Sequence, residues 1–399
     1  MRLKLLLTLA LSLVCIPALA QLVLRSEGAP LLRRVAGVAP PPGELDVPFE
    51  PTHPQVVAFM LQQAAVGAGD IVYDLGCGDG RIVVAAVKDF HAARGVGFDL
   101  DPQRIREAEE NAQRAGVSDR VHFAVQDIMT ADIGDATVVT LYLLNEVNLQ
   151  LRPRLFQQLR PGTRVISHAF TMGDWDPDQT LHHPKARGKV VYLWIIPAPV
   201  GGRWSWDDDV FGERFHFTLD LNQEFQFISG TLSTGSVAPA RVTNATLKGK
   251  EIAFDAEIAV GGKPTTIHWA GTVDGDRITG QRLTLTRPIA IQRAWVAARP
   301  PADLAGTWRV TIDAPSSSLT GGGLLLSRES HGSLIAEYQG KPVWDCYTWG
   351  ASIRFDVPSH GGSSAVFCGR LEGDTLKGVV SLPDSTSGTW TAVRAAGGK

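Results

Sequence analysis

The stretch IVYDLGCGDGR, residues 71–81, decides the fold of this 399-residue chain. An apolar strand ends at Leu75, and a helical pattern begins at Arg81. Between them, glycines alternate with other residues at Gly76, Gly78 and Gly80. Glycines let the chain turn tightly at a strand end and bring the backbone close to a ligand. A dinucleotide fingerprint would place its third glycine at position 81, so we expect a ligand without a pyrophosphate.

Strand and helix patterns alternate on both sides of this turn. The helical patterns cover residues 54–65, 81–90, 102–115 and 147–159, and the strand patterns cover 71–75, 95–100, 121–125, 137–144, 164–170 and 190–196. Such alternation predicts an α/β domain with a mainly parallel, Rossmann-like sheet that helices cover on both faces. Ligands in such folds bind outside the carboxyl ends of the strands.

Carboxylates follow three successive strands of the expected sheet. Asp74 belongs to the first strand end and would meet the ammonium of an amino-acid group through charge-assisted hydrogen bonds. Asp99 ends the next strand and could accept hydrogen bonds from both hydroxyls of a ribose, and Asp127 could accept one from an adenine amino group. Asp101 precedes Pro102 and is expected to cap the helix instead. Together the three carboxylates indicate a ligand with an amino-acid part and an adenosine part.

The pattern resembles the class I S-adenosylmethionine-dependent methyltransferases. It is more closely similar to the family of the ATP synthase c-subunit lysine methyltransferase and its prokaryotic relatives. The resemblance covers residues 47–199 and rests on the segments 47–52, 74–83, 95–102 and 138–144, and on 161–165 running into Phe170 and Trp175. It implies a methyltransferase domain over residues 48–199.

The resemblance also implies a cofactor and a reaction. S-adenosyl-L-methionine is the expected cofactor, and the residues expected to bind it are Thr52, Asp74, Gly76, Gly78, Asp79, Gly80, Asp99 and Asp127. A protein lysine is the expected methyl acceptor. The alternatives are a small-molecule or lipid methyltransferase, and a non-catalytic envelope protein that binds the cofactor and acts through its β region.

Methyl transfer to lysine requires a neutral amine, and removing the proton at pH 7 costs roughly 4 to 5 kcal/mol from an ordinary pKa near 10.4. Asn145 and Glu146 are the candidate catalytic residues, at a strand end where the family more usually has a proline-containing turn. Glu146 could instead only complement the dipole of the following helix. Asp174 and Trp175 are candidates for the acceptor pocket, although loops often contain such residues without function. No metal site is expected.

An all-β region follows Pro199, with short alternating strands and many Gly-Asp turns. Its motifs recur: Ile252-Ala253-Phe254-Asp255 matches Ile353-Arg354-Phe355-Asp356, and Trp295 with Arg299 matches Trp390 with Arg394. Two tandem β units, 200–299 and 300–399, are therefore predicted. Cys346 and Cys368 lie on two expected strands of the second unit, so they form either a disulfide or a pair of buried thiols.

The first 20 residues are typical of an export signal, with Arg2 and Lys4 before an apolar run and Ala18-Leu19-Ala20 at its end. An uncleaved membrane anchor is the alternative. Residues 21–47 have the composition of a Pro- and Gly-rich linker. We therefore expect a periplasmic or envelope protein, or a membrane-anchored one, whose protein substrate could also lie in the envelope. A net charge of −3 makes nucleic acid an unexpected partner. The oligomeric state cannot be read from the sequence.

Overall fold

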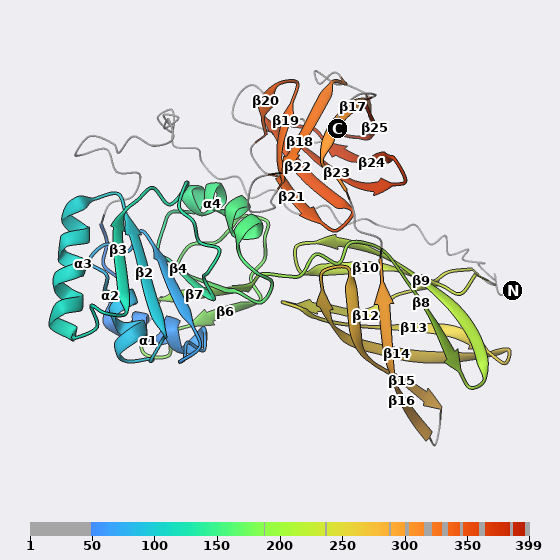
Figure 1. Cartoon of the computed structure of the whole chain (residues 1–399), viewed down its shortest axis with the longest axis horizontal. Helices are drawn as coiled ribbons and strands as arrows, with labels where there is room; N and C mark the ends of the chain where they lie inside the picture. The colour runs from blue at the N-terminus through green and yellow to red at the C-terminus, as the bar shows by residue number, and fades with distance from the viewer. Residues whose placement is uncertain are drawn as a thin grey trace, which may run out of the picture. The chain divides into compact units, whose positions relative to one another are not determined.

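The computed structural model contains one seven-stranded and two nine-stranded sheets (Figure 1). It describes residues 49–186, 188–235, 238–286, 289–299, 303–314, 321–328, 334–343, 346–358, 364–383 and 386–395. The expected signal and linker therefore lie outside the described residues. Among the residues described, no helix is long and apolar enough to cross a membrane.

The seven-stranded sheet belongs to the expected α/β domain. Its elements are α1 (Pro54–Gln63), β1 (Ile71–Leu75), α2 (Arg81–Lys88), β2 (Arg94–Asp99), α3 (Pro102–Ala115), β3 (Val121–Val125), β4 (Val138–Leu141), α4 (Asn145–Gln158), β5 (Arg164–His168), β6 (Gln179–His182) and β7 (Val190–Ile195). The strand order is β3-β2-β1-β4-β5-β7-β6, in which β1 to β5 are parallel and β7 is antiparallel to both of its neighbours, β5 and β6. The prediction of a mainly parallel, Rossmann-like sheet is confirmed.

Helices cover both faces of this sheet because its strands are apolar on both sides. Val72, Val138 and Ile166 pack against the apolar stripes of α1, α2 and α3. Tyr73 and Val139, one position along their strands, point to the opposite face and belong to the cluster that contains Leu151 and Leu155 of α4. Asp101 caps α3 as expected, since its Oδ1 accepts a hydrogen bond from the Gln103 backbone N–H at 2.7 Å.

Two nine-stranded antiparallel sheets follow the α/β domain. The first contains β8 (Gly202–Val210), β9 (Glu213–Glu224), β10 (Phe227–Ser233), β11 (Ala240–Arg241), β12 (Thr243–Lys248), β13 (Glu251–Val260), β14 (Lys263–Asp274), β15 (Arg277–Thr286) and β16 (Ile289–Ala298). The second contains β17 (Gly306–Asp313), β18 (Gly323–Arg328), β19 (Leu334–Tyr338), β20 (Lys341–Pro342), β21 (Cys346–Trp349), β22 (Ser352–Pro358), β23 (Ser364–Glu372), β24 (Thr375–Ser381) and β25 (Ser387–Arg394). In both sheets the first strand along the chain pairs with the last one: β8 with β16, and β17 with β25.

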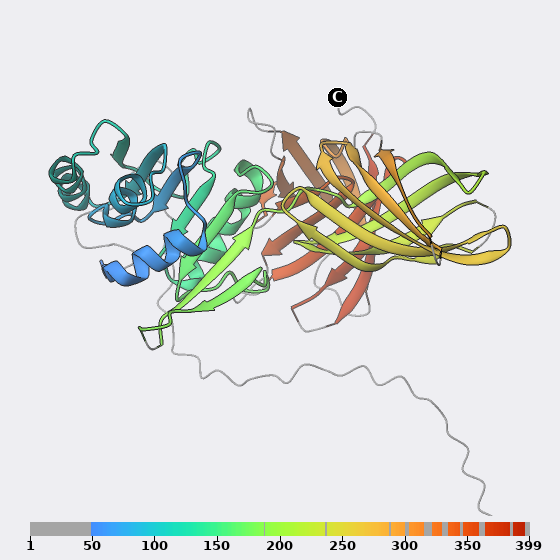
Figure 2. The same cartoon turned by 90° about the horizontal axis from the view of Figure 1, so that it is seen from below.

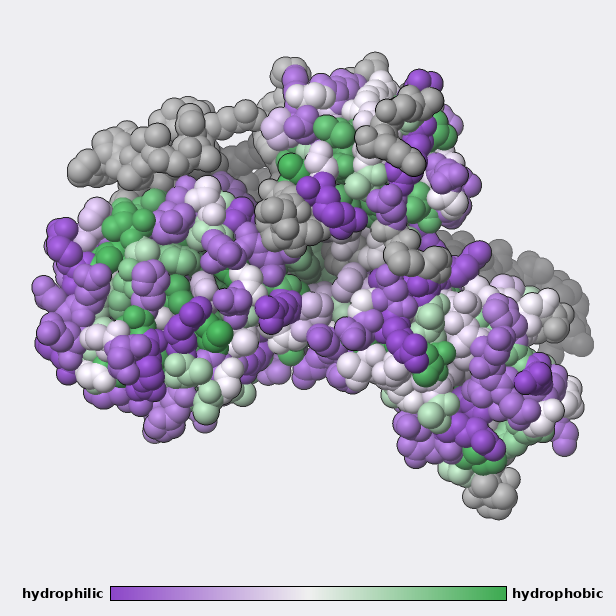
Figure 3. All heavy atoms as spheres, in the orientation of Figure 1, coloured by the Kyte–Doolittle hydropathy of each residue, from purple (hydrophilic) through white to green (hydrophobic). Residues whose placement is uncertain are grey.

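Each nine-stranded sheet curves around its own apolar interior (Figure 2). The two edges of each sheet lie close together: β10 contacts β12 in the first sheet, and β19 contacts β21 in the second. The interior of the first includes Trp206, Phe217 and Trp269, and that of the second includes Phe355 and Trp390. On the face drawn in Figure 3, hydrophilic residues are spread over all three sheet-containing parts, with hydrophobic patches between them.

The expected disulfide between Cys346 and Cys368 is wrong in this structure. Cys346 pairs with Phe355 on one side of β22, whereas Cys368 pairs with Arg354 on the other side. The two cysteines therefore lie two strand spacings apart, about 9 to 10 Å. A disulfide requires Cα atoms within about 7 Å, and neither cysteine forms one.

Candidate active site

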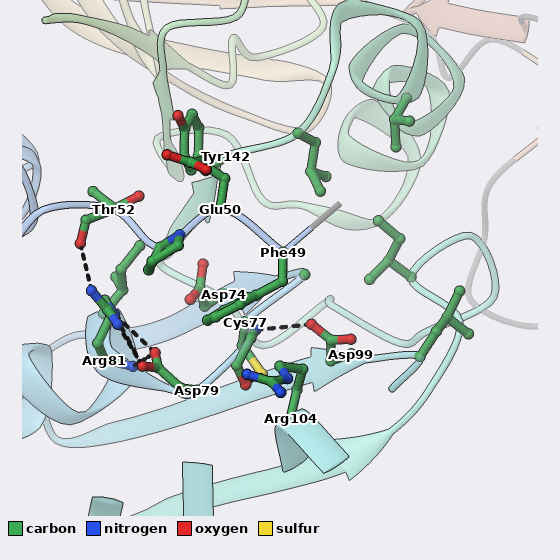
Figure 4. Close-up of a pocket in the computed structure, with 18 of the residues that line it drawn as sticks. Phe49, Glu50, Thr52, Asp74, Cys77, Asp79, Arg81, Asp99, Arg104 and Tyr142 are labelled. Atoms are coloured by element: carbon green, nitrogen blue, oxygen red, sulfur yellow. Dashed lines mark hydrogen bonds and ion pairs between the residues drawn. The ribbon is translucent and has the colours of Figure 1, made fainter. Parts of the chain in front are cut away.

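A cleft opens at the carboxyl ends of β1, β2, β3 and β4 (Figure 4). The lining residues come from the glycine loop, from the segment before α1 and from the ends of these strands. They are Phe49 to Thr52, Asp74, Gly76 to Asp79, Arg81, Ile82, Asp99, Leu100, Arg104, Asp127 to Met129, Tyr142, Leu143 and Val147. The structure thus gathers the expected strand-end carboxylates and most of the glycine loop into one cleft.

The glycine loop is shaped for the close approach of another group. Gly78 has a φ of +51°, which side chains other than glycine rarely adopt. A Cβ atom there would lie 2.5 Å from the ring of Phe49, which covers the loop. The Arg104 guanidinium lies 4.5 Å from the centroid of that ring in a cation–π contact. The segment before α1 therefore closes over the loop where the cofactor is expected.

Asp79 and Thr52 both contact Arg81, and these contacts fix the shape of the cleft. The Asp79 carboxylate forms an ion pair with Arg81 at 2.6 Å. Burial opposes ionisation of Asp79, but its hydrogen bonds with Arg81 lower the pKa of this carboxyl. Arg81 also donates to the Thr52 carbonyl at 3.1 Å, so one guanidinium ties the loop to the segment before α1. The expected cofactor contacts of Asp79 and Thr52 remain predictions.

Asp74 is a buried carboxylate at the floor of the cleft. Thr140 donates a hydrogen bond to its Oδ1 at 2.7 Å, and no cationic side chain pairs with it among the described residues. Burial, with help from the charges of Asp99 and Asp79, raises the pKa of Asp74 to about 7. A buried charge is costly unless it is paired. A carboxylate held in this way fits a ligand that brings its own ammonium group.

Asp99 and Asp127 are oriented by backbone N–H groups. Asp99 accepts hydrogen bonds from Gly78 at 2.8 Å and from Asp101 at 2.9 Å, one on each oxygen. Asp127 Oδ1 accepts one from Met129 at 2.8 Å. Each carboxylate oxygen has two lone pairs, so acceptor capacity is left for ribose hydroxyls and an adenine amino group. The carboxylates of Asp74, Asp99 and Asp127 therefore fit the groups of S-adenosylmethionine.

The expected catalytic residues lie outside the cleft. Asn145 is the first residue of α4, and its Oδ1 accepts a hydrogen bond from the Thr171 backbone N–H at 2.9 Å. Glu146 is exposed in the first turn of α4, where it complements the helix dipole. Neither residue lines the cleft. The expected catalytic role of this pair remains a prediction.

Asp174 and Trp175 do not line the cleft either. Trp175 is fully buried, packs against Phe225 and donates its indole N–H to Gln226 at 2.9 Å. Asp174 forms ion pairs with Arg152 and Arg354. These two residues connect the loop after β5 to segments far along the chain, which the local sequence could not indicate. Their expected place in an acceptor pocket remains a prediction.

Sequence reasoning missed Glu50 and Tyr142, which do line the cleft. Tyr142 directly follows β4, so its place after a parallel strand was the available signal. Glu50 belongs to the segment 47–52, and its place two residues before Thr52, an expected cofactor-binding residue, was the available signal. Both lie at the β4 end of the cleft, beyond the strand-end carboxylates (Figure 4).

Comparisons with known proteins match the same part of the chain. A family model described as the ANTKMT methyltransferase domain matches residues 74–179. The chain is 44% identical over 151 residues to a protein-lysine N-methyltransferase of Saccharolobus islandicus, which covers 38% of this chain and 94% of the relative. It is 32% identical over 134 residues to the ATP synthase c-subunit lysine N-methyltransferase of Mus musculus, covering 34% of this chain and 53% of that relative.

A solved structure is also similar. It is described as an RNA methyltransferase from Salinibacter ruber in complex with S-adenosyl-L-homocysteine. It is 51% identical, covers 37% of this chain and 93% of the other, and has a TM-score of 0.35.

The fold, the cleft and these relatives define the chain as an S-adenosylmethionine-dependent methyltransferase. Its methyl donor is S-adenosyl-L-methionine. More specifically, the chain belongs to the same family as the relative from Saccharolobus islandicus, and its residues 74–179 match the ANTKMT methyltransferase domain.

Proposed function

We propose that this methyltransferase modifies a lysine side chain of a protein. The observation that carries the proposal is the 44% identity to a protein-lysine N-methyltransferase over 94% of that relative. The cleft agrees with it, because a carboxylate and a phenol, Glu50 and Tyr142, line the end that the donor-binding carboxylates leave open. Such groups suit an amine better than an apolar acceptor.

Bound S-adenosylmethionine supplies an electrophilic methyl group on a positively charged sulfur. The chain contributes binding and alignment, which is most of the catalytic task in an in-line displacement. Asp74, Asp99 and Asp127, at the ends of β1, β2 and β3, would hold the donor. Arg81 pairs with Asp79 and donates to the Thr52 carbonyl, which keeps the segment before α1 closed over the glycine loop.

Calorimetry and labelled methyl transfer test this proposal. The purified chain is titrated with S-adenosylmethionine and then incubated with the methyl-labelled donor and a cell-envelope protein extract. We expect micromolar or tighter binding and label recovered as methyl-lysine after acid hydrolysis. Label in the lipid or small-molecule fraction alone would favour another acceptor. Binding without any transfer would favour the non-catalytic alternative.

We also propose that the two nine-stranded sheets are tandem copies of one β unit, within residues 200–299 and 300–399. Their strand orders support this, as do matched contacts. The Arg299 guanidinium lies 4.3 Å from the ring centroid of Trp204, and Arg394 lies 4.4 Å from that of Trp308. Both indoles donate to the carbonyl four residues earlier. We assign these units an interaction or spacing role.

We propose that the chain acts outside the cytosol or on a membrane, on an envelope protein. The sequence of residues 1–20 motivates this proposal. Mass determination of the mature N-terminus, combined with cell fractionation, tests it. A mature chain that begins at Gln21 would support export, whereas an intact N-terminus in the membrane fraction would support an anchor. An intact chain in the cytosol would refute both.

A further inference from the structure

The order of the strands indicates where the methyl acceptor must enter. The three donor-binding carboxylates lie at the ends of β3, β2 and β1, which are consecutive in the sheet. Asp127 is expected at the adenine, Asp99 at the ribose and Asp74 at the amino-acid end. The next strand in the sheet is β4. The part of the cleft beside β4 is therefore left for the acceptor.

Two polar side chains from distant segments occupy that part of the cleft. Tyr142 directly follows β4, and Glu50 lies on the segment before α1. Figure 4 shows the Glu50 carboxylate beside the Tyr142 ring, with Asp74 deeper in the cleft. Glu50 is exposed, so a side chain arriving from solvent meets it first. Burial raises the pKa of the Tyr142 hydroxyl, and the charge of Glu50 adds to this effect.

Tyr142 is held from behind by a buried histidine. The ring centroids of Tyr142 and His168 lie 4.1 Å apart, and His168 is 1% exposed. Its Nδ1 lies 3.4 Å from the Thr52 hydroxyl, which links β5 to the same segment that carries Glu50. Burial lowers the pKa of His168 to about 4, so the imidazole is neutral near pH 7. A neutral ring does not repel a cation that approaches Tyr142.

We propose that Glu50 and Tyr142 form the acceptor subsite for a lysine ammonium, with His168 and Thr52 as positioning residues behind the Tyr142 ring. This inference rests on the proposed lysine methylation. Glu50 pairs with the ammonium at the mouth of the cleft. The Tyr142 oxygen accepts a hydrogen bond from the amine and directs its lone pair into the cleft.

The reaction at this subsite balances without a further reagent. The lysine ammonium first releases one proton to solvent water at the open mouth of the cleft. The nitrogen lone pair then forms the new N–C bond, while the S–C bond breaks and its electron pair stays on the sulfur. The sulfur loses its positive charge and the methylated nitrogen gains one, so Glu50 faces a cation both before and after the transfer.

The test separates cation binding from turnover. Nα-acetyl-L-lysine amide is titrated into the full chain saturated with S-adenosylhomocysteine, followed by NMR, and Nα-acetyl-L-norleucine amide serves as the uncharged control ligand. We expect Glu50→Gln to weaken the lysine probe about tenfold and the norleucine probe hardly at all. Glu109→Gln, which removes an exposed carboxylate from α3, should change neither. Equal affinity of wild type and Glu50→Gln for the lysine probe would overturn the inference.

Kinetics with the labelled envelope extract test Tyr142. Tyr142→Phe keeps the ring that packs on His168 and removes only the oxygen. We expect kcat to fall about 10- to 100-fold, with the affinity for S-adenosylhomocysteine unchanged. An unchanged kcat would remove Tyr142 from the subsite. If the wild type binds the lysine probe through Glu50 but makes no methyl-lysine, the proposed function fails and the cation subsite stands.

Discussion

At the scale of single residues, we expect Asp74 to make cofactor binding depend on pH. Its pKa of about 7 means that the carboxyl carries a proton below pH 7 in the cofactor-free protein. An ammonium ligand requires the ionised form. We therefore expect the affinity for S-adenosylmethionine to rise as the pH increases through 7. Asp74→Asn should lower the affinity about 10- to 100-fold and remove this pH dependence, as measured by calorimetry between pH 5.5 and 8.

The stability of the cofactor-free protein is the control for Asp74. A carboxyl whose pKa is raised on folding stabilises the fold below its ordinary pKa of 3.8, and this contribution is lost as the pH rises through about 7. Asp74→Asn should therefore be at least as stable as the wild type at pH 8 in urea unfolding. A large loss of stability at pH 8 would mean that Asp74 serves the fold and that weaker binding only reflects unfolding.

His168 makes the opposite contribution to stability. Because burial lowers its pKa from 6.5 to about 4, the unfolded chain binds a proton more readily than the folded one in this range. Its contribution is complete above pH 6.5 and decreases by up to about 3 kcal/mol as the pH falls to 4. His168→Gln should therefore show a smaller loss of unfolding free energy between pH 7 and 4.5 than the wild type.

The exposed His122 provides the matched control for that measurement. His122→Gln should retain the acid sensitivity of the wild type. Since Asp74 contributes with the opposite sign over the same pH range, each variant is compared with the wild type at the same pH. Identical pH profiles for His168→Gln and the wild type would refute the assignment to His168.

The strand-end carboxylates of the cleft were predicted from the sequence, whereas Glu50 and Tyr142 were not. Asp74, Asp99 and Asp127 could be placed because the carboxyl ends of parallel strands meet at one edge of a sheet. Glu50 reaches the cleft only because the chain before α1 folds back over the glycine loop, a contact that no local pattern encodes. Asn145 and Glu146 were also expected there, but α4 begins at Asn145 and neither residue lines the cleft.

At the scale of elements, the turn from β1 to α2 depends on Gly80. It is the N-cap of α2, with a φ of +73°, and a Cβ atom there would lie 2.7 Å from both Ala108 and Phe123 in the core. Gly80→Ala should therefore destabilise the fold by about 2 to 4 kcal/mol, because backbone strain and overpacking add. Urea unfolding measures this cost.

Gly116 separates the two contributions. It ends α3 with a φ of +71°, but a Cβ atom there would meet nothing within 4 Å. Gly116→Ala therefore carries only the backbone strain, about 1 kcal/mol. If both variants lose the same free energy of unfolding, overpacking against Ala108 and Phe123 does not contribute to the loss in Gly80→Ala.

The sequence predicted the parallel elements better than the antiparallel ones. Buried parallel strands are continuous apolar runs followed by helices, and this pattern identified β1 to β5. The short exposed strand β6 carries no such signal and was not expected. The disulfide prediction was wrong for a related reason. The alternation of apolar and polar residues places Cys346 and Cys368 on strands, but it does not show that β22 lies between those strands.

At the scale of the whole molecule, one ionic cluster joins the methyltransferase domain to the second nine-stranded sheet. Arg152 of α4 donates to the Tyr347 hydroxyl at 2.8 Å and pairs with Asp174. Arg354 of β22 pairs with the other oxygen of Asp174 at 3.0 Å. Burial opposes ionisation, but the two guanidinium groups lower the pKa of Asp174. Asp174 thus connects segments that are 180 residues apart.

Removing the shared carboxylate should destabilise this junction. Arg152 and Arg354 are 3% and 6% exposed, and Asp174→Asn removes the carboxylate that they share, although Arg354 keeps its ion pairs with Glu224 and Asp356 at 3.6 Å. Breaking a buried pair costs about 3 to 5 kcal/mol, and the partial exposure of Asp174 reduces this to about 1 to 3 kcal/mol. We expect a lower melting temperature of the whole chain, measured by tryptophan fluorescence. The neighbouring exposed Asp176 is the control, and an equal loss in Asp176→Asn would show that the cluster does not hold the junction together.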